Sequence, residues 1–256
     1  MTAEQHVQSL VRGLAVIRSF DAQHPSLTLS EVAAHAGISR AAARRFLLTL
    51  VDIGYVRAVG KSFELTPRVL ELGVSYLSAL GLPDIAQPHL EALSAQVGES
   101  VSVAVLDGTD IVYVARAAGR RIMSVDITTG TRFPAYATAL GRILIAALPE
   151  DEWEQHLPKP PLTRFTPQTL TTTPQLRAEL RAAREQGWAR ADGELEEGLH
   201  SLAMALTGPQ GPLGAINIAT GPVRAHPHLT ADQLLESLRA AASAIEADYA
   251  AVRLTR

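Results

Sequence analysis

The 256-residue sequence contains no cysteine. That absence excludes disulfide frameworks and cysteine-ligated metal sites, and it suits a reducing compartment. The sequence also lacks any apolar run approaching 18 residues without a charge or a helix breaker, and its N-terminus has no signal-peptide core. We therefore expect a soluble, cytoplasmic protein that does not enter a membrane.

Catalytic and metal-binding signatures are missing as well. The sequence has no GxxxxGK phosphate loop, no HExxH motif and no GxSxG nucleophile elbow. His226 and His228 are two residues apart without a third ligand nearby in sequence, which is more typical of surface residues than of a metal site. We predict no metal, no cofactor and no enzymatic activity.

Charge is distributed unevenly along the chain. A net charge of −3 argues against non-specific nucleic-acid binding by the whole protein. Residues 1–80, however, carry 8 Lys and Arg against 6 Asp and Glu, whereas residues 81–256 carry 15 against 20. The sign of this asymmetry favours DNA contact by the N-terminal part alone.

The most specific pattern lies in Leu29–Leu65, which reads as two helices joined by a glycine turn. Thr28 or Ser30 can cap a short first helix that ends at Gly37, and Ser39 can cap a second helix. The second helix has an apolar stripe at helical spacing that predicts a buried face. The stripe consists of Ala43, Phe46, Leu47, Leu50 and Ile53, before Gly54 ends the helix. This arrangement is typical of a helix-turn-helix.

The other face of the second helix is basic. Arg40 and Arg44 lie one turn apart, and such like charges cost an isolated helix roughly 0.2–0.5 kcal/mol unless an anion lies opposite them. A two-stranded wing follows, with Lys61 at its tip. A solvated helical hairpin could carry similar charges, but the wing and the turn glycine favour DNA binding. We expect Arg40 and Arg44 at the major groove, with Arg45, Thr28 and Lys61 nearer phosphates. The predicted DNA-binding residues are Thr28, Ser39, Arg40, Arg44, Arg45 and Lys61.

Flanking helices complete the predicted N-terminal domain, residues 1–80. A first helix over residues 7–20 should pack Leu10, Leu14 and Ile17 against the helix-turn-helix. A largely apolar helix over residues 66–80, capped by Thr66, predicts a connecting element that packs on another surface, such as a partner subunit.

The remaining chain, residues 81–256, predicts an α+β domain with an antiparallel sheet. Residues 100–118 are expected to form two strands, with a hairpin turn over 107–110 and a returning strand over 111–115. Further strands are expected over residues 122–127, 188–192, 199–206 and 213–220. Helices are expected over residues 84–97, through 141–146, and over 150–156, 173–186 and 230–252. The last helix should bury Leu234, Leu238, Ala241, Ile245 and Tyr249. Residues 129–134 are expected to form a loop.

The helix-turn-helix with its wing, together with the preceding VQSLVRGLAVI, resembles the IclR family of bacterial transcriptional regulators, and the resemblance covers nearly the whole chain. It implies a winged helix-turn-helix joined by a helical linker to a GAF-like effector-binding domain, and it implies a homodimer or a dimer of dimers on double-stranded operator DNA. The segment TRFPAYATALGR is similar to the subgroup that controls breakdown of aromatic acids through the β-ketoadipate route.

An effector site is expected where that segment starts a helix. The first turn leaves backbone N–H groups free around Ala135–Thr138, which suits a carboxylate, and Arg132 could add a charge-assisted bond. An ordinary loop-helix junction with a surface arginine would look the same, but the resemblance favours a pocket. It also implies pocket roles for Asp192, in a run of four carboxylates, and for positions on two strands. The predicted effector-binding residues are Arg132, Tyr136, Ala137, Thr138, Asp192, Met204, Asn217 and Ala219.

These features together predict a DNA-binding regulator that responds to a small carboxylate, most simply an aromatic acid or a β-ketoadipate-pathway metabolite. Met204 and Ala219 replace hydroxyl or thiol side chains of several relatives, which favours a larger, partly apolar effector. Two alternatives stay open: an enzyme of small carboxylic acids with an appended DNA-binding domain, and an architectural DNA-binding protein without a ligand.

Overall fold

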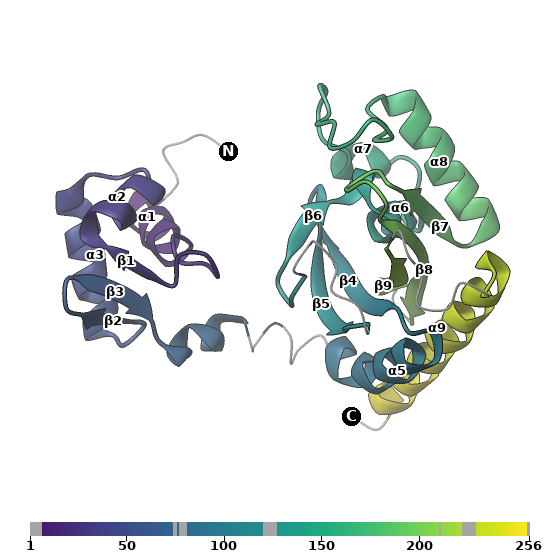
Figure 1. The fold of residues 1–256 in the computed structure, drawn as a ribbon, viewed down its shortest axis with the longest axis horizontal. Coiled ribbons are helices and arrows are strands. Elements are labelled where there is room, and N and C mark those ends of the chain that lie inside the picture. The colour runs from purple at the N-terminus through teal and green to yellow at the C-terminus, as the bar shows by residue number, and fades with distance from the viewer. Residues whose placement is uncertain are drawn as a thin grey trace. The chain divides into compact units, whose positions relative to one another are not determined.

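The computed structural model describes residues 7–73, 76, 81–119, 127–209, 211–221 and 229–254. The chain divides into two compact units, residues 1–79 and 80–256 (Figure 1), and each unit is considered by itself. The predicted strand over 122–127, apart from Ile127, most of the predicted connecting helix after residue 73, and His226 and His228 lie outside the described residues.

The first unit is a winged helix-turn-helix. Its elements are α1 (Gln8–Ile17), β1 (Ser26–Thr28), α2 (Leu29–His35), α3 (Arg40–Asp52), β2 (Val56–Val59), β3 (Ser62–Leu65) and the 3₁₀ turn η2 (Pro67–Leu70). The helix boundaries follow from local capping. Thr28 and Glu31 form a capping box at the start of α2, and Ser39 caps α3. Gly37 takes a φ of 64° in the turn between the two helices, a conformation that glycine adopts without strain.

Packing in this unit corrects three details of the prediction. The apolar stripe of α3 is buried at Ala43, Leu47 and Leu50, but Ile53 at its end is 46% exposed. In α1 the fully buried side chain is Val16, whereas Leu10 and Leu14 are exposed. The wing has a third strand, β1, which pairs antiparallel with β3.

The second unit is built on an antiparallel six-stranded sheet with the order β6-β5-β4-β9-β8-β7. The strands are β4 (Ser100–Asp107), β5 (Asp110–Ala117), β6 (Arg132–Pro134), β7 (Ala189–Asp192), β8 (His200–Gly208) and β9 (Gly211–Thr220). The helical elements are α5 (Leu82–Val97), η3 (Ala135–Ala137), α6 (Ala139–Ala146), α7 (Trp153–His156), α8 (Thr173–Gln186) and α9 (Ala231–Leu254).

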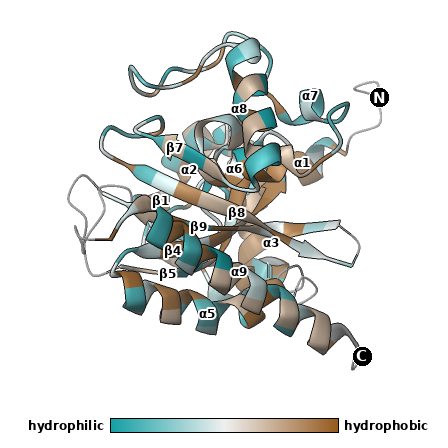
Figure 2. Ribbon diagram, turned by 90° about the vertical axis from the view of Figure 1, so that its right-hand side faces the viewer, coloured by the Kyte–Doolittle hydropathy of each residue, from teal (hydrophilic) through white to brown (hydrophobic). Residues whose placement is uncertain are grey.

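Helices cover both faces of this sheet. Helices α5 and α9 pack on one face, and Figure 2 shows hydrophobic and hydrophilic residues alternating along α5. Helix α6 packs on the other face, against β8 and β9, with α8 outside it. Because both faces are covered, the polar positions of β4 are buried together with its valines, from Ser100 to Val105. The alternation of serine and valine in β4 therefore does not indicate that one face of the strand is exposed to solvent.

Two further details differ from the sequence prediction. The expected loop over residues 129–134 contains the edge strand β6, which pairs with β5, and the 3₁₀ turn η3 precedes α6. In α9, Ala242 is buried in place of the predicted Ala241. Among the described residues, no helix is both long enough and apolar enough to cross a membrane.

Candidate DNA interface and effector pocket

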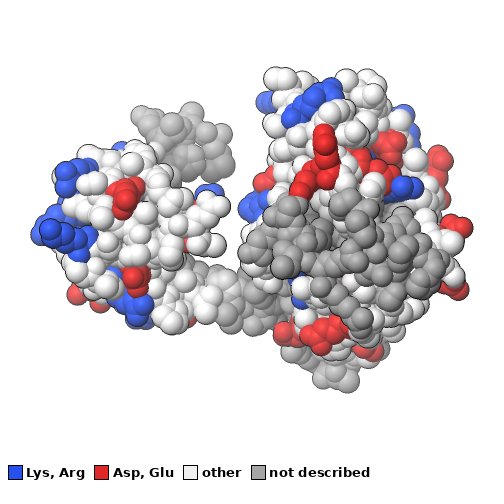
Figure 3. Space-filling model, viewed as in Figure 1, with Lys and Arg blue, Asp and Glu red and all other residues white. Residues whose placement is uncertain are grey.

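Helix α3 presents its arginines to solvent. Ala43, Leu47 and Leu50 pack in the core of the unit, which fixes the rotation of the helix. Arg40 and Arg44 are exposed one turn apart, Arg40 at the first position of the helix. Arg45 is exposed on the flank of the helix, and within the described part of the chain none of the three arginines has an ion-pair partner. Figure 3 shows the basic side chains gathered at the α3 side of this unit.

The predicted phosphate contacts have different surroundings. Lys61 is exposed in the turn between β2 and β3. Thr28 is committed to capping: its backbone N–H and its hydroxyl donate to the Glu31 carboxylate at 2.7 and 2.8 Å, and these bonds lower the pKa of Glu31. Ser39 Oγ accepts from the backbone N–H of Ala42 at 3.2 Å. Both hydroxyls thus position the ends of α2 and α3.

A narrow cavity, with about 480 Å³ of space not filled by atoms when the open solvent at its mouth is counted, lies in the second unit between the start of α6 and the sheet. Four of the predicted effector residues line it: Ala137, Thr138, Asn217 and Ala219. Its other lining residues are Tyr113, Ile127, Ala139, Leu140, Ala191, Glu194, Leu195, Leu199 and Ser201. A mostly apolar lining with a few polar groups is typical of small-molecule sites.

The free backbone donors of this cavity lie further along the chain than predicted. Ala135 N–H already donates to the Thr109 carbonyl at 2.9 Å, beside the Asp110–Pro134 pair of the β5–β6 ladder. Helix α6 begins at Ala139, and Thr138 Oγ1 caps the N–H of Gly141 at 3.0 Å. The first-turn N–H groups without an intrahelical partner are therefore those of Ala139 and Leu140, and both residues line the cavity.

Arg132, a predicted effector residue, does not line this cavity. It lies in the edge strand β6, and its side chain is 44% exposed. Its guanidinium pairs with Asp107 at 2.7 Å and Asp110 at 3.3 Å, at the β4–β5 turn. Pairing in the β5–β6 ladder directs Arg132 to these carboxylates.

Tyr136 is also absent from the cavity lining. Its hydroxyl donates to the Thr163 carbonyl at 2.6 Å, and its ring packs with Leu162 and Leu176 in a separate apolar cluster. Burial raises the pKa of the Tyr136 hydroxyl and outweighs the hydrogen bond to Thr163, which lowers it.

Met204 and Asp192 do not line the cavity either. Side chains alternate between the two faces of a strand, so Ala203 packs in the α6-side core while Met204 points to the other face. Likewise Ala191 lines the cavity, and Asp192 lines a separate hollow beside α9. There Asp192 accepts from His200 at 2.8 Å and pairs with Arg190. Burial opposes ionisation of Asp192, but these hydrogen bonds outweigh it and lower the pKa.

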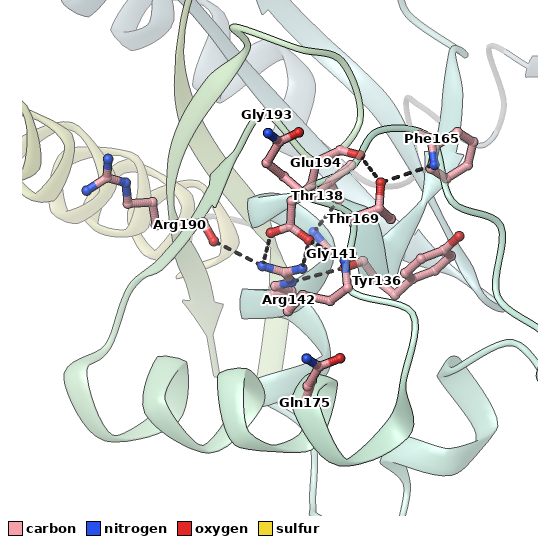
Figure 4. A network of polar contacts seen from close by, with 12 residues as sticks. Tyr136, Thr138, Gly141, Arg142, Phe165, Thr169, Gln175, Arg190, Gly193 and Glu194 are labelled. Atoms are coloured by element: carbon pink, nitrogen blue, oxygen red, sulfur yellow. Dashed lines mark hydrogen bonds and ion pairs between the residues drawn. The ribbon is translucent and has the colours of Figure 1, made fainter.

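A buried ion pair beside the cavity is not predicted from the sequence. Arg142 in α6 donates to both carboxylate oxygens of Glu194, at 2.6 and 2.5 Å (Figure 4). Arg142 also donates to the carbonyl of Tyr136, and Glu194 accepts from the backbone N–H of Leu170 at 3.1 Å. The sequence does contain one indication of this pair. Arg142 is a cation inside the otherwise apolar helix ALGRILIA, and a buried cation requires a buried anion as its partner.

Three further polar side chains line the cavity, those of Asn217, Ser201 and Tyr113. Asn217 Nδ2 donates to Ser201 Oγ at 2.8 Å. Burial raises the pKa of Tyr113 to about 12, so its phenol stays protonated at neutral pH. Within the described residues, no group of three or more His, Cys, Asp or Glu residues could hold a metal ion.

A winged helix-turn-helix with an unpaired basic helix, in one chain with a sheet domain that encloses a small-molecule cavity, defines a DNA-binding transcriptional regulator that responds to an effector. Two family models identify the family of regulators to which the chain belongs. The IclR helix-turn-helix domain matches residues 9–60, and the bacterial transcriptional regulator IclR C-terminal domain matches residues 74–247. The chain belongs to the IclR family, and its second unit is the GAF-like effector-binding domain of that family.

The chain is similar to two regulatory proteins of known name and to one solved structure with a bound ligand. The chain is 42% identical over 214 residues to the Pca regulon regulatory protein of Pseudomonas putida, covering 83% of this chain and 74% of that protein. It is 35% identical over 242 residues to the p-hydroxybenzoate hydroxylase transcriptional activator of Acinetobacter baylyi, covering 92% and 89%. An IclR homologue from Microbacterium hydrocarbonoxydans, solved in complex with 4-hydroxybenzoate, has a TM-score of 0.83 at 26% identity, covering 94% and 98%.

Proposed function

We propose that this regulator responds to a small aromatic carboxylate, such as 4-hydroxybenzoate or protocatechuate, or to β-ketoadipate, bound in the cavity at the start of α6. The observation that carries the proposal is the position of the Ala139 and Leu140 N–H groups on an otherwise mostly apolar lining. The partial positive charge of a helix start favours the acid group. The apolar lining suits a ring or a carbon chain. Related proteins named for p-hydroxybenzoate or solved with 4-hydroxybenzoate support the same class.

The experiment is calorimetry of the full chain with 4-hydroxybenzoate, its neutral amide and glyoxylate. We expect the acid to bind at least about tenfold more tightly than the amide, since hydrogen bonds to a charged group contribute roughly 1.5–3 kcal/mol. Arg132→Ala is the matched control and should leave the affinity unchanged, because Arg132 lies outside the cavity. Equal affinities for acid and amide would remove the carboxylate from the proposal.

We propose that residues 1–80 form the DNA-binding domain with its linker and residues 81–256 the effector domain. In this assignment Arg40 and Arg44 contact base edges, while Arg45 and Lys61 contact phosphates. Their exposure without ion-pair partners supports these roles. Thr28 and Ser39 assist by capping α2 and α3, which fixes where the two helices begin.

We propose that the protein acts in the cytoplasm as a homodimer or a dimer of dimers on operator DNA. Apolar side chains on one stripe of α1 and in the connecting segment are exposed in the single chain, which supports a subunit interface. They are Val7, Leu10, Val11, Leu14, Leu70, Leu72 and Tyr76.

We propose that the protein is not an enzyme. The relatives named above are regulatory proteins, and among the described residues lining the cavity there is no histidine, lysine or cysteine to activate a nucleophile. Unchanged 4-hydroxybenzoate after prolonged incubation with the protein, measured by chromatography, is the expected result. The open cavity argues against a purely architectural role, for which bulky side chains would fill this space.

A further inference from the structure

Leu48 is the one large apolar side chain that α3 exposes to solvent. Within Arg40–Asp52, all of which the structure describes, the other large apolar side chains are buried or half-buried, whereas Leu48 is 47% exposed. A single exposed leucine is common on a protein surface and by itself indicates no binding site. The neighbours of Leu48 on the helix are what distinguish it.

Leu48 lies on the basic surface of α3. It follows Arg44 by four residues and Arg45 by three, so the three side chains are neighbours on one side of the helix. Both arginines are exposed, and among the described residues neither has an ion-pair partner. The Thr49 hydroxyl donates to the Arg45 carbonyl at 3.0 Å, so this donor is already used within the helix. The surface therefore combines two unpaired cations with one apolar side chain.

This combination restricts what can cover the surface. A wholly apolar partner would bury the two guanidinium groups without an anion, which is unfavourable. A small anion such as phosphate would pair with the arginines and leave Leu48 in water. Double-stranded DNA offers both kinds of group, because it carries a phosphate on every nucleotide and thymine presents a methyl group in the major groove.

We propose that Leu48 contacts the methyl group of a thymine in the operator and so contributes to sequence specificity. The proposal rests on the proposed DNA interface, because it takes α3 to lie in the major groove with Arg44 at a base edge. Four residues of helix rise about 6 Å, which is close to two base-pair steps. The thymine should therefore lie within about three base pairs of the base that Arg44 contacts.

The test replaces single thymines by deoxyuridine, which removes the methyl group and keeps the hydrogen-bonding groups of the base. The probe is a duplex that the full chain selects from a random pool, with affinity measured by fluorescence anisotropy at one salt concentration. We expect at least one replacement to weaken binding about fourfold, because burying one methyl group contributes roughly 0.8 kcal/mol. Leu48→Ala should bind the thymine and deoxyuridine duplexes equally.

Ile53→Ala is the matched control. Ile53 follows the last residue of α3 and is 46% exposed, so this variant truncates a similarly exposed side chain at the other end of the helix from Arg40. It should keep the fourfold difference between the two duplexes. Leu48→Gln is a second variant in case Leu48→Ala does not fold by circular dichroism. Glutamine retains the helix-forming tendency of leucine without its apolar end, so Leu48→Gln should also lose the difference.

The inference is overturned if no replacement within about three base pairs of the position read by Arg44 weakens binding, or if the folded Leu48 variants keep the full difference. A variant that keeps the difference but self-associates more weakly by light scattering would assign Leu48 to a subunit contact instead. Failure of the proposed DNA interface is distinguishable, because Arg40→Ala and Arg44→Ala would then bind the selected duplex as tightly as the unchanged protein.

Discussion

Replacing Arg142 by methionine should leave the Glu194 carboxylate buried without its main partner. The two side chains are only 3% and 8% exposed, and the remaining hydrogen bond to the carboxylate group comes from the N–H of Leu170. Removing one member of a buried ion pair typically costs roughly 3–5 kcal/mol, because the other charge stays desolvated. We expect a loss of that size in the free energy of unfolding of the second unit. Its midpoint temperature should fall by roughly 6–20 °C.

Urea unfolding followed by circular dichroism measures this loss, with Arg181→Met as the control. Arg181 pairs with Glu150 at 2.6 Å, but these side chains are 56% and 43% exposed, so its replacement should cost at most about 1 kcal/mol. The double variant Arg142→Met/Glu194→Leu removes both buried charges and should be more stable than Arg142→Met alone. A double variant whose loss equals the sum of the two single losses would refute the reasoning, because independent side chains give additive effects.

The remaining predictions concern DNA binding, assembly and pH. Arg44→Ala should relax base preference at one operator position at a cost of about 1–3 kcal/mol, whereas Lys61→Ala should weaken binding to all sequences alike and reduce the salt slope by about one; uniform losses in both would contradict this division. Light scattering at micromolar concentration should detect at least a dimer, and Leu10→Glu should weaken it if α1 contributes to the interface; a monomer with and without operator DNA would refute the assembly. Because the pKa of Asp192 is lowered on folding, its contribution to stability is present above the ordinary value of 3.8 and is lost as pH falls through the folded-state pKa. Asp192→Asn should therefore destabilise at pH 7 and have little effect at the acid end of a pH series of unfolding curves.

Elements with local signals are predicted well from this sequence. The limits of α2 and α3 follow from capping by Thr28 and Ser39, and α8 spans the predicted residues 173–186. Capping and helical periodicity involve residues at most a few positions apart, so they can be read directly from the chain. The edge strands β1 and β6 have three residues each, and they exist because of partners far away in sequence, β3 and β5.

The residues of the pocket differ in the same way, because some of their positions depend on contacts between residues far apart in sequence. Thr138, Asn217 and Ala219, which are among the predicted effector residues, line the cavity. Met204 lies on the other face of the sheet, and the sequence alone does not specify which residues of its strand face the cavity. Arg142 and Glu194 are 52 residues apart, and no sequence pattern specifies that they pair. The cation expected near the effector, Arg132, is held instead by two carboxylates of a neighbouring turn.

The charge of the cavity restricts how an acid can bind. Among the described residues that line it, Glu194 is the only one with a full charge, and Arg142 neutralises it. An effector carboxylate therefore depends on neutral donors, the first N–H groups of α6 and a protonated Tyr113, with about half an elementary charge from the helix start. Such a site provides less electrostatic attraction than an arginine would. Apolar contact has to contribute the rest of the affinity, which favours a ring over a two- or three-carbon oxoacid.

Effector binding can change DNA affinity only if the ligand prefers one arrangement of the protein over another. Within the first unit, the end of α3 is attached firmly to the start of the connecting segment. Thr66 Oγ1 donates to the Gly54 carbonyl at 2.6 Å, and Arg68 Nη1 donates to the Ile53 carbonyl at 2.8 Å. Arg68 also lies over the ring of Tyr55. A displacement of the connecting segment would therefore move α3 with it, because bending at the join would break both hydrogen bonds at the C-terminus of the helix.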